Sequence, residues 1–182
     1  MRKTLTIAVT VCVLLLANGV GFAAKKKDKR AKIDAEAAES IERLFEENAK
    51  AKALFERSFA YAAFDNTQTA LIISGGGGKG VGVERSSGER TYMKMASAGV
   101  GIGIGIQMMK TVFLFETESA YRKFVDEGWD ADTSASAAAG DAGINAQSEF
   151  VNEMMVYQMT EKGLIAQASL KGTKYWKWDK LN

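Results

Sequence analysis

Residues 99–107 read GVGIGIGIQ, an alternation of glycine with branched aliphatic side chains. A period of two is typical of a β-strand, in which successive side chains point to opposite faces. The glycines then share one face, which lets another backbone or an aromatic ring approach closely. We expect this strand to pack tightly within a curved sheet. The alternative, that its glycine face is the floor of a groove for a lipid chain, stays open.

A second glycine-rich segment, SGGGGKG at residues 74–80, resembles a phosphate-binding loop at first sight. A P-loop requires Gly, four residues and then Gly-Lys-Ser/Thr, but Ile73 and Gly80 occupy two of the required positions. The spacing Gly75-x-Gly77-x-x-Gly80 fits a dinucleotide-binding pattern, yet residues 81–83 alternate like a strand instead of starting a helix. We therefore interpret the run as a flexible turn or a close crossing within a sheet.

Helices are predicted before and between the strands. In residues 33–64 large apolar side chains recur every three or four positions and so share one helical face. Asn48 interrupts that face and is expected to cap a second helix. A docked helix is favoured over a membrane-surface helix, because the polar face is more acidic than basic. A short helix is also expected after Thr117, ended by Gly128.

Further strands surround the segment at 99–107. Residues 81–85 and 90–96 are predicted to form a hairpin around a turn at 86–88. Other predicted strands are residues 71–73, 111–115, 151–159 and 164–170, with a turn at 161–163. Residues 130–147 are predicted to form a loop with a strand of small residues inside it. The predicted fold class is α+β, with N-terminal helices packed on a curved, mostly antiparallel, glycine-rich β-sheet that is barrel-like or a sandwich.

The first 23 residues have the layout of a secretory signal peptide. Arg2 and Lys3 precede an apolar run, and Gly21-Phe22-Ala23 fits a cleavage site before residue 24. An uncleaved anchor is the alternative, although the run is shorter than the roughly 20 residues of a membrane span. We predict an exported protein of the periplasm or cell envelope, with a signal peptide at 1–23, a basic linker at 24–32 and a single domain at 33–182.

Composition excludes many kinds of catalytic site. The 182 residues include no His and a single Cys, so Ser-His-Asp triads, Cys-His pairs and His-ligated metals are ruled out. Cys12 and the formal charge of +2 both belong to the first 23 residues, so the remaining chain is neutral and has no thiol. An enzyme would have to depend on carboxylates. The densest acidic cluster is Asp126, Glu127, Asp130 and Asp132, whose spacing lacks the Gly and Glu of a calcium loop.

The ordered set of segments resembles the SYLF domain, a lipid-binding module also known as an actin-regulator domain. The resemblance runs from about Ile41 to Tyr175. It is carried by Ile41-x-x-Leu44-Phe45, Asn48, Gly80-Val81-Gly82, Tyr92, residues 100–107, residues 112–115, residues 117–124, Gly128-Trp129-Asp130, residues 162–166 and Leu170-x-Gly172-Thr173-Lys174. Departures are Ala49 and Asp65, where the family usually has proline, and Lys171, where it usually has glutamate.

The resemblance implies membrane association, with phosphoinositides bound through basic residues, and it supplies no catalytic residues. We therefore predict a non-enzymatic protein without cofactor or metal that binds anionic phospholipid, phosphoinositide-like or with another anionic headgroup. Neither actin nor nucleic acid is expected as a partner of an exported protein. The alternatives are a structural or partner-binding envelope protein with an adaptable methionine-rich surface, and, less favoured, a carboxylate-based enzyme.

Two segments are candidates for the lipid contact. The N-terminal arm, residues 25–32, contains Lys25, Lys26, Lys27, Lys29, Arg30 and Lys32. The C-terminal tail supplies Lys171, Lys174, Lys177, Trp176 and Trp178, and Trp beside Lys is typical of a membrane interface. The alternatives are a solvated linker for the arm and, for the tail, a last strand whose aromatic side chains close the core.

Overall fold

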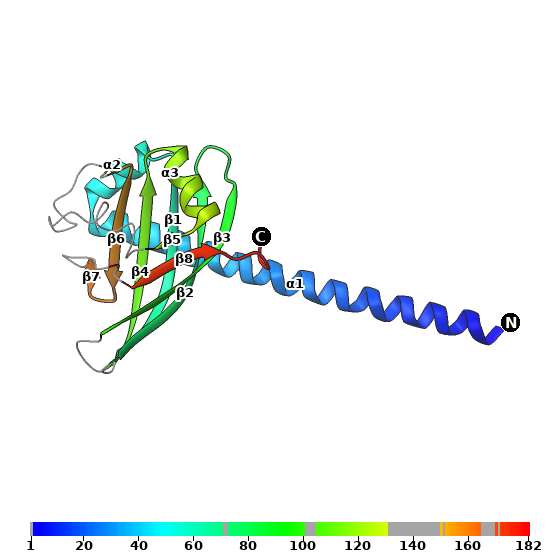
Figure 1. The fold of residues 1–182 in the computed structure, drawn as a ribbon. Helices are drawn as coiled ribbons and strands as arrows, with labels where there is room; N and C mark the ends of the chain where they lie inside the picture. The colour runs from blue at the N-terminus through cyan, green and yellow to red at the C-terminus, as the bar shows by residue number, and fades with distance from the viewer. Residues whose placement is uncertain are drawn as a thin grey trace.

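The fold is seen in a computed structural model, drawn in Figure 1. It describes the chain except for residues 1, 71–72, 101–104, 131–149, 151, 165–169 and 171. For residues 2–23, 68–70, 73–74, 99–100 and 105–107 only the backbone is described. Within the described residues, no helix combines the length and the apolar character that crossing a membrane requires.

Two helices precede the sheet. Helix α1 (Arg2–Glu47) is continuous, and α2 (Ala49–Arg57) follows it directly. Asn48 separates them as predicted, because its side-chain oxygen accepts hydrogen bonds from the backbone amides of Lys50 and Ala51 at 3.0 and 3.2 Å. Residues 24–32 lie inside α1, and the division of the chain into signal, linker and domain stays a prediction.

The prediction that helix continues to Phe64 is wrong beyond Arg57. Ser58 ends α2, and its hydroxyl donates a hydrogen bond to the carbonyl of Phe55 at 2.7 Å. From Ala60 onward the side chains alternate between two cores, which is the period of a strand. The apolar side chains at 59–64 therefore lie alternately on the two faces of a sheet.

Eight strands form one antiparallel sheet that curls into a half-barrel (Figure 1). They are β1 (Ala60–Ala70), β2 (Ile73–Glu84), β3 (Arg90–Val100), β4 (Gly105–Phe115), β5 (Trp129–Asp130), β6 (Met154–Thr160), β7 (Gly163–Leu164) and β8 (Thr173–Lys177). Their order is β5-β8-β3-β2-β1-β4-β6-β7. Helix α3 (Glu118–Arg122) and one wider helical turn, η1 (Lys123–Glu127), follow β4. The α+β prediction is confirmed.

Most predicted strands are present, but residues 99–107 do not form a single one. β3 ends at Val100 and β4 begins at Gly105, and the two run in opposite directions, so the chain reverses between them. The pattern predicts strands correctly but not the reversal. Residues 71–72, 165–169 and most of the loop predicted at 130–147 lie outside the described residues. The 81–96 hairpin, the 111–115 strand, the turn at 161–163 and the Thr117 cap are confirmed.

A hydrophobic core lies on each face of the sheet. On one face, α1 and α2 cover the first core, which includes Leu44, Leu54, Val112 and Tyr157. On the other face, α3, η1 and β8 close over an aromatic core. Its rings, in edge-on and tilted contacts, are those of Phe64, Phe113, Phe115, Tyr121, Phe124, Trp129 and Tyr175. The sheet is therefore buried on both sides over its central part.

The glycine run lies within β2, so the predicted turn is wrong and the predicted close approach is confirmed. A Cβ on Gly80 would overlap the carbonyl oxygen of Ala63 and the ring of Phe64. A Cβ on Gly78 would lie 2.5 Å from the carbonyl oxygen of Asp65. Glycine at these positions lets β1 and β2 coil tightly together, which curves the sheet.

Replacing Gly80 by alanine should destabilise the fold strongly, because β1 backbone occupies the space that the methyl group needs. We expect chemical denaturation to show a loss of about 2 kcal/mol or more in unfolding free energy. Gly75→Ala is the matched control, since a Cβ there meets nothing within 4 Å. Equal stability of the two variants would contradict the proposed strand coiling.

Tyr157→Phe should stabilise the protein. Among the residues that the structure describes, the buried Tyr157 hydroxyl has no hydrogen-bond partner, which costs about 1–3 kcal/mol relative to a ring without it. Tyr92→Phe is the control and should destabilise by about 1 kcal/mol or more, because the Tyr92 hydroxyl donates to Asp34 at 3.0 Å. Urea denaturation of the wild type and the two variants measures both changes in the free energy of unfolding.

The same substitution tests a pH effect. Burial raises the pKa of Tyr157 to about 12, above its ordinary value of 10.0. The folded state therefore disfavours the phenolate form of Tyr157. Below pH 10 this ring leaves the free energy of unfolding unchanged, but between about pH 10 and 12 the unfolded state loses the proton more readily and the free energy of unfolding falls. Tyr157→Phe should lose less stability than the wild type over that range. If the wild type and the variant lose equal stability over that pH range, Tyr157 is not buried as described.

Candidate functional site

Helix α1 is held on the sheet by one apolar stripe. Ile33, Ala37, Ile41 and Leu44 follow each other at three- and four-residue spacing and are all buried. This spacing keeps them on one face of the helix, which packs over β1, β2 and β4. The arm, at residues 25–32, precedes this stripe on the same helix, so the stripe determines which arm side chains face the body.

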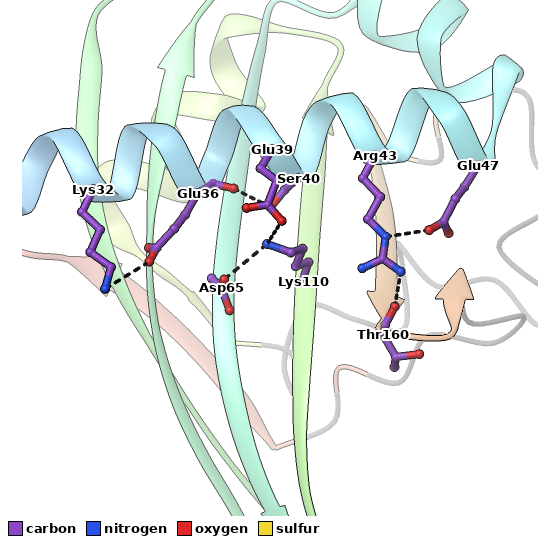
Figure 2. Close-up of polar contacts among 9 residues, drawn as sticks. All are labelled: Lys32, Glu36, Glu39, Ser40, Arg43, Glu47, Asp65, Lys110 and Thr160. Atoms are coloured by element: carbon purple, nitrogen blue, oxygen red, sulfur yellow. Dashed lines mark hydrogen bonds and ion pairs between the residues drawn. The ribbon is translucent and has the colours of Figure 1, made fainter.

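Polar contacts flank the stripe (Figure 2). The ammonium group of Lys110 lies 3.3 Å from a carboxylate oxygen of both Glu39 and Asp65. Glu36 forms a 3.1 Å ion pair with Lys79 of β2. Arg43 donates to Glu47 at 2.7 Å and also to the carbonyl of Thr160. These contacts, which join α1 to β2, β4 and β6, oppose rotation of the helix.

Three arm side chains continue the buried stripe and contact the tail. Lys26, Lys29 and Arg30 precede Ile33 by seven, four and three residues, so they point toward the body. Lys26 donates a hydrogen bond to the backbone oxygen of Asn182 at 2.5 Å. Arg30 donates to the carbonyl of Leu181 at 2.7 Å. The Lys29 ammonium lies 4.5 Å from the centre of the Trp178 ring.

Trp178 is held between two lysines. The ammonium groups of Lys29 and Lys94 each lie 4.5 Å from its ring centre, and its backbone amide donates to the carbonyl of Tyr92 at 2.9 Å. Asn182 completes the attachment to β3, because its side chain accepts from the Tyr92 amide and donates to the Tyr92 carbonyl, both at 2.8 Å. The tail therefore joins β3 to the arm.

The remaining arm cations face solvent. Lys25, Lys27 and Lys32 are exposed, and Lys32 forms a 3.8 Å pair with Glu36 one turn later. Residues 25–32 and 176–182 together, called here the arm–tail surface, contain eight basic and two acidic side chains. The arm–tail surface is therefore strongly positive on a chain whose two charge totals are nearly equal.

Tyr92 links this surface to the sheet beneath it. Its ring lies 5.1 Å from the guanidinium of Arg30, and its hydroxyl donates to Asp34, which also pairs with Arg90 at 3.5 Å. Burial, followed by the hydrogen bond to Asp34 and the charge of that carboxylate, raises the pKa of Tyr92. The phenol thus stays neutral and remains a donor across the physiological range.

Two of the other predicted tail residues form ion pairs with the segment around η1 and β5. Lys174 pairs with Asp130 at 2.8 Å and Lys177 with Asp126 at 3.4 Å. Trp176 keeps 42% of its surface exposed. Lys171 lies outside the described residues. The alternative that the tail aromatics close the core applies to Tyr175, which is 2% exposed and belongs to the aromatic core.

Comparison with known proteins identifies the domain. Residues 96–182 match the family model described as Las17-binding protein actin regulator. The chain is 37% identical over 150 residues to Beta cell expansion factor A of Aeromonas veronii. The chain belongs to the SYLF family. The match covers 82% of this chain and 58% of the relative, so the chain spans somewhat more than half of that protein's length.

The family is one of lipid-binding or actin-regulating domains, and the resemblance predicted from the motifs is confirmed. Tyr92 and Lys94, which contact the arm–tail surface, were not predicted from the sequence. Their alternation along the predicted strand at 90–96 places them on one face, but that pattern carries no information about contact with the tail.

Two of the four acidic residues considered for a carboxylate-based enzyme form ion pairs in this SYLF domain. Asp126 and Asp130 form the surface ion pairs described above, and Asp132 lies outside the described residues. Among the residues that the structure describes, no group of three acidic or thiol side chains is placed to hold a metal ion. Two cavities of about 710 and 350 Å³ adjoin α1. Both are lined by Arg43 and Glu161 with other residues of mixed charge.

Replacing Trp178 by leucine should destabilise the SYLF domain by about 1–2 kcal/mol, because two contacts between a cation and its ring are lost. Trp176→Leu is the matched control on an exposed side chain and should change stability by less than about 0.5 kcal/mol. Thermal and urea unfolding provide the measurement. A larger loss in the Trp176 variant would contradict this arrangement of the tail.

Proposed function

We propose that this SYLF-family chain binds anionic phospholipid at the arm–tail surface, without catalysis. One observation carries the proposal. The two segments predicted as lipid contacts, more than 140 residues apart in sequence, meet through Lys26, Lys29 and Arg30 on one side and residues 178–182 on the other. The membership of the chain in a family of lipid-binding or actin-regulating domains supports it.

The geometry suits phosphate-bearing headgroups. Lys25, Lys27 and Lys32 are exposed on a rigid helix, so their ammonium groups reach an external surface without rearrangement of the fold. A base near an anionic membrane contributes about 1 kcal/mol. Trp176 adds an exposed indole ring, a group that favours the boundary between headgroups and acyl chains.

The proposed partner is a membrane surface with anionic headgroups, phosphoinositide-like or of another kind. The signal-like segment at 1–23 supports export to the periplasm or cell envelope with peripheral attachment. Neither actin nor nucleic acid is then an expected partner. The alternative of a methionine-rich partner surface has less support, because Met93, Met95, Met155 and Met159 are buried and Met108 is exposed.

The triple variant Lys25→Gln, Lys27→Gln and Lys32→Gln tests the proposal. Vesicle co-sedimentation should show binding of the full chain to phosphatidylcholine vesicles only when phosphatidylglycerol is included, and binding should weaken with salt. Loss of three charges should reduce affinity by about 100-fold at low salt. The three side chains are exposed, so their replacement should leave the fold intact.

The control variant Lys52→Gln, Lys123→Gln and Lys162→Gln removes the same charge from exposed positions outside the arm–tail surface. Its affinity for the vesicles should fall only slightly, through the general effect of a lower net charge. Equal losses in the two triple variants would show that the arm is not the contact. Binding that does not respond to salt would contradict an electrostatic attachment.

A further inference from the structure

One part of the sheet carries no charge. A quarter of the chain is charged, yet residues 66–78 and 95–109 contain no charged side chain. The sheet aligns these segments, with Thr67 opposite Met108 and Ile73 opposite Val100. Their strands extend past α1 at the lower left of Figure 1. The described residues of this region, 66–70, 73–78, 95–100 and 105–109, are called here the ribbon.

Five described positions of the ribbon lie on its face toward α1. Thr67, Gly75, Gly77, Ala98 and Met108 share this face and are exposed. A Cβ on Gly75 would meet nothing within 4 Å, and one on Gly77 would meet only a backbone oxygen at 3.9 Å. Edge strands of a sheet normally carry charged side chains to prevent association, and the sequence of the ribbon contains none.

Lysines line the boundary between the ribbon and the body. Lys94 lies opposite Lys79 on the neighbouring strand, and Lys110 lies two strands further along the same row. Asp65 of β1 lies between Lys79 and Lys110 in this row, and Lys79 also pairs with Glu36 of α1. Trp176 lies opposite Lys94 in the same row.

The exposed apolar side chains lie at the same boundary. Trp176 and Met108, 42% and 50% exposed, are the large hydrophobic side chains most exposed to solvent among the residues whose burial is described. Trp176 lies on β8 and Met108 on β4, on either side of β1, β2 and β3. The order from the free end is therefore an uncharged ribbon, a row of three lysines with one aspartate and one tryptophan, and a charged body.

This order matches the polarity profile of one membrane leaflet, in which acyl chains are followed by an interface that favours tryptophan and lysine. We propose that the ribbon inserts into one leaflet of a phospholipid bilayer, with Trp176 and the lysine row at the level of the headgroups. This inference rests on the proposed lipid binding and assigns it a second, apolar contact, which shares only Trp176 with the arm–tail surface.

The dimensions agree with shallow insertion. From Lys79 to Ile73 there are six residues, or about 20 Å of strand, which exceeds the headgroup layer but not the roughly 30 Å hydrocarbon thickness. Backbone groups at the open strand edges need polar partners, because unpaired backbone groups are costly in hydrocarbon. We therefore expect a tilted ribbon that enters one leaflet and does not cross the bilayer.

Site-specific labelling tests the insertion in the full chain carrying Cys12→Ser. Single cysteines replace Thr67 and Ala98, about two and four residues beyond the lysine row, and carry an environment-sensitive fluorophore. Ser87, exposed in the turn at the opposite end of β2 and β3, is the control position. Vesicles contain phosphatidylcholine and phosphatidylglycerol, with or without a lipid that bears a quencher on its acyl chain.

We expect the label at Ala98 to be quenched most, the label at Thr67 less, and the label at Ser87 not at all. Ala98→Asp should weaken vesicle binding by roughly tenfold, because a carboxylate would enter the leaflet, whereas Ser87→Asp should not. Circular dichroism and thermal unfolding confirm folding of each variant, and the labelled proteins give an answer even if Ala98→Asp does not fold.

The two lipid proposals fail in different ways. Salt-sensitive vesicle binding without acyl-chain quenching at Thr67 or Ala98 would overturn ribbon insertion and leave the arm–tail surface standing. Quenching that persists with purely phosphatidylcholine vesicles would support insertion and contradict the requirement for anionic lipid. A fluorescence change that follows protein concentration without vesicles would show self-association of the ribbon and overturn its insertion.

Discussion

The packing of α1 on the sheet is the interaction on which the rest of this structure depends. Ile33, Ile41 and Leu44 are almost completely buried, and each contributes about 1.5–3 kcal/mol by leaving water. The helix covers one face of β1, β2 and β4, whose other face holds the aromatic core. Without the helix, one face of the central sheet would be exposed and the arm would have no defined direction.

That packing also orients the charges. Because the arm and the buried stripe belong to one rigid helix, the side chains that precede Ile33 on the same face must meet the body, and the others must face solvent. The tail packs against the arm side chains that face the body. Trp178 and Asn182 lie between β3 and the arm, so Lys26, Lys29 and Arg30 contact the tail while the other three arm cations point to solvent.

The proposed membrane contacts use two different physical effects at two places in one fold. The arm–tail surface offers positive charge, whose attraction acts over about a Debye length and weakens with salt. The ribbon offers uncharged surface, whose contribution is short-ranged and does not depend on salt. A protein with both would first be attracted to an anionic surface and then be held by it more firmly.

Much of the fold was predictable because it follows from local patterns. Period-two alternation identified the 81–96 hairpin and the strand at 111–115, and Asn48, Thr117 and Gly128 marked helix ends through short-range hydrogen bonds and backbone geometry. The failures also have local causes. Apolar residues at 59–64 satisfy a helical and a strand period equally, and the glycine alternation at 99–107 continues through a chain reversal without a change in pattern.

The sequence by itself determined the family, the α+β class and the two basic segments, since these depend on residue identity and short spacing. Only the tertiary structure showed that Lys29 and Lys94 hold Trp178, and that Lys79, Lys94 and Trp176 form one row beside an uncharged ribbon. Those contacts join positions up to about 150 residues apart. Strand order and register bring them together, and neither can be read from the spacing of residues along the chain.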